Sequence, residues 1–103
     1  MNIIQTFLDL TNKTYPHGTE HLLEPFLPKD ISMDKFGNYF YLIGDNPRSI
    51  FASHLDTVSS MHLDVVHEFE DDGRIVGTDG QTTLGADDKA GVTIMLYMIE
   101  NKI

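Results

Sequence analysis

The order of apolar patterns along the chain predicts an α/β layer fold, built as one domain over residues 1–103. Apolar residues recur at helical spacing near both ends of the chain. Between them lie two apolar runs with the composition of strands, and then a strand–turn–strand pattern. A chain of 103 residues has room for one small domain. Because no further strand pattern follows the last helical segment, we expect the sheet to be incomplete at residue 103.

Helices are expected in three segments. Residues 2–12 carry apolar side chains three and four positions apart, which predicts an amphipathic helix. Thr19 is a candidate N-cap for a second helix, which Pro25 keeps short. Residues 88–102 repeat the helical spacing through four apolar side chains: Val92, Met95, Leu96 and Ile99.

Strands are expected in the middle of the chain. Residues 34–44 are predicted to form a turn followed by a strand, with Gly37-Asn38 as the turn signal. Residues 49–58, "SIFASHLDTV", predict a second strand that presents His54 near its C-terminal end. Residues 65–80 predict a hairpin that turns at Asp72-Gly73.

The composition excludes several classes of function. A formal charge of −9 disfavours a nucleic-acid partner, because binding phosphates needs clustered Lys and Arg. It indicates a soluble surface, or carboxylates that bind metal. The absence of cysteine excludes disulfides and thiolate metal sites. No apolar run approaches the roughly 20 residues of a membrane span, and the N-terminus lacks the basic start of a signal peptide, so we expect a cytoplasmic protein without a membrane partner.

Three residues form the candidate site. His54 and Asp56 are two positions apart at a strand end, which places both side chains on one face. A metal-binding imidazole usually donates its other N–H to a carboxylate, a role open to Asp56. Asp87 precedes the last helix, and its two oxygens could bridge two ions. Imidazole and carboxylate suit zinc, with manganese or cobalt as substitutes. The alternative is a hydrogen-bonded surface histidine and an N-capping Asp87.

The residues around His54 and Asp87 are more informative than the spacing of these two positions. "SHLDTV", residues 53–58, followed by "TTLGADDKAGV", residues 82–92, resembles the co-catalytic zinc exopeptidases of the peptidase T, dipeptidase and acetylornithine-deacetylase-like superfamily. Peptidase T is the nearest pattern. "YPHGTE", residues 15–20, and "DKFGN", residues 34–38, agree with it.

The resemblance implies a fold and a site. The chain would be the N-terminal part of a three-layer α/β zinc-exopeptidase domain. His54 would bind one zinc, Asp87 would bridge two, and Asp56 would be the catalytic-site carboxylate that orients His54. Asp88 would not be a ligand, and the peptide bond after Asp87 would be cis. The complete enzyme would be a tripeptidase- or aminopeptidase-like hydrolase that cleaves amide bonds of short peptides or acylated amino acids.

Several residues of the family pattern have no counterpart in this chain. The family's Glu-Glu pair, which supplies the general base and a ligand, has no counterpart here, and neither have its further acidic ligand and final histidine. His62 and His67 match no family ligand, and Glu100 is expected to be a solvated surface residue.

We therefore expect the isolated chain to bind zinc weakly and to hydrolyse no peptide. The missing groups would come from the C-terminal part of a longer product or from a second polypeptide. The competing hypotheses are a non-catalytic interaction module or gene remnant that retains the peptidase fold, and an α/β domain whose motifs match by chance.

Overall fold

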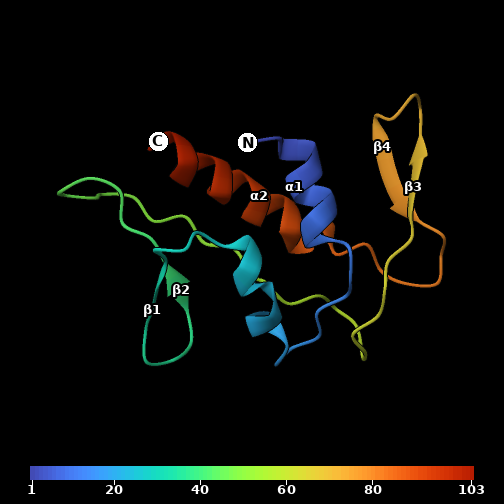
Figure 1. Ribbon diagram of the computed structural model, residues 1–103, viewed down its shortest axis with the longest axis horizontal. Helices are drawn as coiled ribbons and strands as arrows, with labels where there is room; N and C mark the ends of the chain where they lie inside the picture. Colours follow the sequence, from blue (N-terminus) through green and yellow to red (C-terminus); the bar gives the residue numbers. More distant parts are fainter.

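The computed structural model describes residues 1–103 and contains three helices and two small antiparallel sheets, which confirms the mixed α/β class (Figure 1). The elements, in chain order, are α1 (Ile3–Leu10), the 3-10 helix η1 (Glu20–Phe26), β1 (Ser32–Met33), β2 (Tyr39–Phe40), β3 (His67–Glu70), β4 (Ile75–Thr78) and α2 (Ala86–Asn101). Helices α1 and α2 lie side by side, and the β3–β4 hairpin projects away from them (Figure 1).

The helices form close to where the apolar spacing predicts them. Helix α1 begins after Asn2, whose side chain accepts a hydrogen bond from the backbone N–H of Gln5 at 3.0 Å, as an N-cap does. The second predicted helix is the 3-10 helix η1, with Pro25 inside it. Thr19 occupies the N-cap position, but its hydroxyl donates to Pro16 O at 2.7 Å and does not cap the helix. Thr19 is therefore the N-cap residue by position, as predicted, but without a side-chain capping bond.

Both sheets are local hairpins. In the first, Ser32 pairs with Phe40 and Met33 with Tyr39. Its turn is closed by the Asp34 carboxylate, which accepts from the N–H groups of Phe36 and Asn38 at 2.9 Å each. These contacts lower the pKa of Asp34, chiefly through Asn38.

The second hairpin lies where the sequence predicts it. Strands β3 and β4 pair in the register His67 to Thr78 and Glu70 to Ile75. The turn between them uses three consecutive residues with positive φ, at Asp71, Asp72 and Gly73. The hairpin predicted for residues 65–80 is confirmed.

Of the two other predicted strands, the one in residues 34–44 is confirmed in part, because a turn is followed by the short strand β2, and the one in residues 49–58 is wrong. Of residues 34–44, only Tyr39–Phe40 forms a strand, and residues 49–58 form none. Within 49–58, Thr57 N, bonded to Tyr15 O at 2.6 Å, is the one backbone group with a backbone partner. A strand needs a neighbour for its ladder of hydrogen bonds, and no segment of this chain lies in that position. The expected sheet is therefore not formed, although the segment keeps an irregular, extended course (Figure 1).

A small core lies where the three helices meet. It consists of Leu10, Tyr15, Leu23, Leu27, Val92 and Leu96, and only 12 of the 103 residues are buried. The surface area is 7296 Å², against about 5,800 Å² for a monomeric protein of this mass. The radius of gyration is 14.4 Å, against about 12.8 Å for a compact domain of this length. The chain therefore exposes more surface than a self-contained domain does. None of its helices has the length and apolar character needed to cross a membrane.

Candidate metal centre

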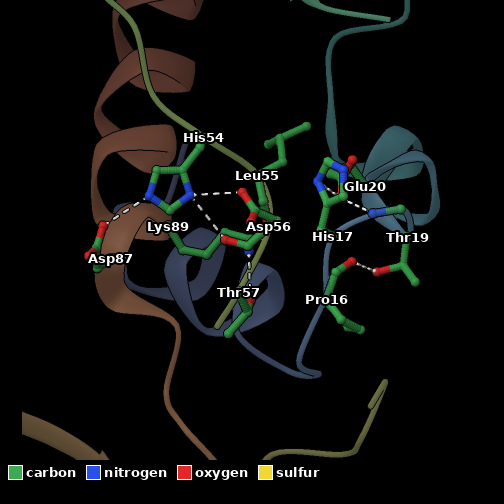
Figure 2. Close-up of polar contacts among 11 residues, drawn as sticks. Pro16, His17, Thr19, Glu20, His54, Leu55, Asp56, Thr57, Asp87 and Lys89 are labelled. Carbon is green, nitrogen blue, oxygen red and sulfur yellow. Dashed lines mark hydrogen bonds and ion pairs between the residues drawn. The ribbon is translucent and has the colours of Figure 1, made fainter. Parts of the chain in front are cut away.

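The structure brings the three predicted site residues together around the His54 imidazole (Figure 2). His54 Nε2 lies 3.0 Å from Asp87 Oδ1, a residue 33 positions along the chain. On the other side of the ring, Nδ1 lies 3.1 Å from both the carboxylate and the backbone oxygen of Asp56. The histidine is thus held between two carboxylates that come from different segments.

The start of α2 sets the position of Asp87. Asp87 and Asp88 have non-helical backbone angles, and the regular helix begins after them. The peptide bond between them is cis, as the resemblance implies. Gly85 occupies the N-cap position with a φ of +84°, and no side chain caps the helix. The alternative role of Asp87 as an N-cap is therefore wrong, and its side chain, 95% exposed, faces solvent and His54.

The surroundings of His54 favour its protonated form. The hydrogen bond with Asp87 has the largest effect and raises the pKa of His54; burial, the next largest effect, lowers it, and the backbone oxygen and charge of Asp56 raise it again, so that the pKa is raised. A protonated ring donates to both carboxylates, which explains the direction of the shift. When Nε2 loses its proton, its lone pair and Asp87 Oδ1 are two adjacent groups that could bind a metal ion, and both face solvent.

These donors fit one part of a zinc site. A neutral imidazole nitrogen and a carboxylate oxygen are ordinary zinc ligands, and the carboxylate of Asp56 on the far nitrogen is the usual support of a ligating histidine. No group of three or more His, Cys, Asp and Glu side chains in the chain is arranged to hold a metal ion. The pair His54 and Asp87 is therefore the donor set that this chain offers.

Lys89 is a residue of this region that sequence patterns did not indicate. It lies two positions after Asp87, and its side chain is completely buried. Its Nζ donates to Leu55 O and to Thr57 Oγ1, the latter at 3.3 Å (Figure 2). Burial lowers the pKa of Lys89 to about 8, although nearby carboxylates, first that of Asp56, oppose the shift. A lysine that follows two aspartates has the pattern of a solvated charge, so no local pattern indicates its burial.

The other candidate residues have partners outside the candidate site. His62 Nδ1 lies 2.7 Å from Thr14 O, and His67 Nε2 lies 2.9 Å from Thr11 Oγ1. Glu100 is exposed, as expected, and its carboxylate accepts from the N-terminal amine at 3.2 Å. None of these three contacts involves His54 or Asp87.

No family model, curated protein or solved structure matches this chain. The function is therefore argued from the geometry around His54 and from the two sequence motifs that contribute its neighbours.

Proposed function

We propose that the chain is the N-terminal metal-binding portion of a dinuclear zinc metallopeptidase of the peptidase T-like, dipeptidase and deacylase type. The complete enzyme hydrolyses amide bonds of short peptides. This chain alone is inactive, because it has no counterpart of the general base or of the remaining ligands. Those groups come from a longer product or from a second polypeptide, which also completes the three-layer α/β domain.

The observation that carries this proposal is the contact between His54 Nε2 and Asp87 Oδ1 at 3.0 Å. A zinc-binding pair must converge although its members lie in separate motifs, and these two do. Asp56 supports the far nitrogen of the same ring. Chance motif matches give no reason for a ligand pair and its supporting carboxylate to meet at one imidazole.

Each side chain has a defined part in this site. His54 and Asp87 would hold one zinc, and the second, exposed oxygen of Asp87 would reach the other ion; manganese or cobalt suits the same donors. Asp56 fixes the ring angle and keeps the proton of His54 on Nδ1, which leaves Nε2 free to bind metal. When bound, zinc supplies Lewis acidity and an activated water for amide hydrolysis. The exposed position of Asp87 leaves room for further ligands and for a peptide substrate.

Zinc binding by the isolated chain tests the site itself. We expect weak binding in competition with a chromogenic chelator, abolished by His54→Ala and by Asp87→Ala. His21→Ala and Asp45→Ala are matched controls, because both residues are exposed and make no side-chain hydrogen bond or ion pair. If all four variants bind zinc like the original chain, the metal site is refuted.

Native mass spectrometry of the protein purified from its own source tests the assembly. The expected result is a longer chain, or a complex with a second polypeptide, that carries two zinc ions and hydrolyses short peptides. A metal-free species of 11.6 kDa would contradict the proposal.

The second candidate function is a non-catalytic interaction module that retains the fold. The observation that favours it is the excess surface, which includes Ile50 at 93% exposure and the neighbouring Phe51. Asp87→Ala distinguishes the two functions. It removes the activity of an assembled peptidase, whereas it leaves partner binding by an interaction module unchanged.

A further inference from the structure

One buried side chain connects the two segments that carry the candidate ligands. Lys89 belongs to α2, two residues after Asp87, and its Nζ donates to the carbonyl of Leu55. Leu55 is the residue between His54 and Asp56. A second bond from the same Nζ reaches Thr57 Oγ1 at 3.3 Å, and the ammonium lies 5.2 Å from the centre of the Tyr15 ring.

The segment that carries His54 has few other attachments. Residues 49–58 form no ladder of hydrogen bonds, and their one backbone–backbone bond is from Thr57 N to Tyr15 O. Ser53 Oγ adds a contact with Met95 Sδ at 2.9 Å, which is a weak acceptor. Leu55 also packs against the core, and Val58 O accepts from Thr83 Oγ1 at 3.2 Å. The carbonyl of Leu55 is nevertheless the backbone group nearest to His54 with a partner in another segment, and that partner is Lys89.

Thr57 also packs against the loop before Asp87. A Cβ atom placed on Gly85 would lie 3.2 Å from Thr57 Oγ1 and 3.3 Å from its Cγ2. The glycine thus lets the two segments approach closely, and Lys89 joins them through the same Thr57 hydroxyl. Both contacts act on the separation between His54 and Asp87.

A buried ammonium is an expensive way to stabilise a fold. Removing a charge from water is costly, and Lys89 forms no salt bridge that would offset the cost. Two oxygens accept from the three N–H groups of Lys89, and an aromatic face lies near the charge. The direction of the hydrogen bonds, toward the residue next to His54, gives the lysine a use that an apolar side chain lacks.

We propose that Lys89 is a positioning residue that fixes residues 54–57 on α2 and thereby sets the His54–Asp87 geometry on which metal binding depends. The inference rests on the proposed function for the identity of the ligand as zinc. The placement of the imidazole against Asp87 is a property of the metal-free chain.

Lys89→Met is the variant that tests this role. Methionine fills the space of the lysine stem, retains its packing and has no donor. The variant removes the desolvation cost of the ammonium but leaves Leu55 O and Thr57 Oγ1 without their donor, so we expect the free energy of unfolding to change little. Zinc affinity should fall about 10- to 100-fold, as on loss of other supporting residues around metals. Leu96→Ala is the control, because it removes core packing on the same helix and should lower stability without a comparable loss of zinc affinity.

A metal-free measurement makes the test independent of zinc. The two-bond ¹H–¹⁵N spectrum of the histidine side chains reports which ring nitrogen of His54 carries a proton and is hydrogen-bonded, with His54→Ala used for assignment. In Lys89→Met the His54 signals should move to those seen in Asp87→Ala. If Lys89→Met does not fold, Thr57→Val, which removes one acceptor of the Lys89 Nζ, should move the same signals in the same direction.

The outcomes separate the two proposals. Unchanged zinc affinity and unchanged His54 signals in a folded Lys89→Met variant would overturn the positioning role. If the original chain binds no zinc, the proposed function fails, and the spectra alone decide the role of Lys89. A loss of zinc affinity in Leu96→Ala as large as in Lys89→Met would reduce Lys89 to a stabilising residue and overturn the inference as well.

Discussion

The exposed apolar surface around Ile50 leads to a quantitative prediction about self-association. The chain has roughly 1,500 Å² more surface than a compact monomer of 11.6 kDa. A standard protein–protein interface uses about 800 Å² of each partner, so the excess is large enough for a specific contact. Ile50, at 93% exposure, lies in a segment whose backbone N–H and C=O groups are also largely without backbone partners. We expect the isolated chain to associate through this segment.

The perturbation is Ile50→Ser. Burying an isoleucine side chain in a contact contributes about 1.5–3 kcal/mol, which corresponds to roughly a 10- to 100-fold change in a dissociation constant. Sedimentation velocity over a concentration series measures this constant. The midpoint of association should therefore move to a concentration about 10- to 100-fold higher in the variant, with unchanged helical content by circular dichroism.

The control for this experiment is Ile75→Ser. Ile75 is 52% exposed, but its strand β4 is already paired with β3. If unpaired backbone is what makes the Ile50 segment associate, the control should leave the midpoint nearly unchanged. The reasoning would be refuted by a chain that stays monomeric at every concentration, or by a control with the same effect as Ile50→Ser.

Two further predictions concern the loop before α2 and one exposed hydrogen bond. Gly85→Ala should lower the unfolding temperature more than Gly80→Ala, because both glycines have φ near +85° but only a Cβ at Gly85 meets Thr57. Thermal unfolding of the two variants measures the difference. Equal decreases in unfolding temperature would show that the close approach of Gly85 to Thr57 does not affect stability. The hydrogen bond from the Tyr39 hydroxyl to the Glu24 carboxylate raises the pKa of Tyr39 to about 12. The stability that this hydrogen bond contributes is therefore fully present below the ordinary tyrosine pKa of about 10, and it is lost as the pH rises through the pKa of Tyr39 in the folded protein. Ultraviolet titration of tyrosinate should show this pKa lowered in Glu24→Ala, and an unchanged titration would contradict the assignment.

The elements that the sequence predicts correctly are those held by nearby residues. Helix α1 lies within residues 2–12, and the β3–β4 hairpin lies within 65–80. Their hydrogen bonds join residues a few positions apart, so apolar spacing and turn residues contain the needed information. The start of α2 is also within two residues of its predicted position.

The strand predicted for residues 49–58 does not form, and the one predicted in residues 34–44 is only two residues long, for the opposite reason. Their composition is that of buried strands, with Ile50, Phe51 and Ala52 in a row. Apolar composition shows that a segment can form a strand when another strand lies beside it, because the hydrogen bonds of a strand need that neighbouring strand. Local patterns describe the segment and not the strands beside it, so its state in this chain could not be predicted from them.

The candidate site shows the same division between local and distant information. Spacing placed His54 and Asp56 on one face, which local geometry can do. The approach of Asp87 came from a motif resemblance, because no local rule brings residues 33 positions apart together. The burial of Lys89 has no local signal, since only its contacts with distant residues, Leu55, Thr57 and the Tyr15 ring, show that its ammonium is removed from solvent.

The candidate site is adjacent in sequence to residues 49–53, whose backbone groups have no backbone partners. The contact between His54 and Asp87 forms although the expected sheet does not, and in our proposal this is because Lys89 holds residues 54–57 from within the chain. The unpaired residues 49–53 lead directly into His54. A polypeptide that pairs with them would therefore bring its own side chains to the edge of the site, where His54 and Asp87 lack further ligands. We expect one docking event to extend the sheet and to complete the metal centre, so that Ile50→Ser weakens zinc binding in the assembled protein and leaves it unchanged in the isolated monomer. If the original chain and Ile50→Ser bind zinc with equal affinity in the assembled state, pairing of residues 49–53 does not affect the proposed metal centre.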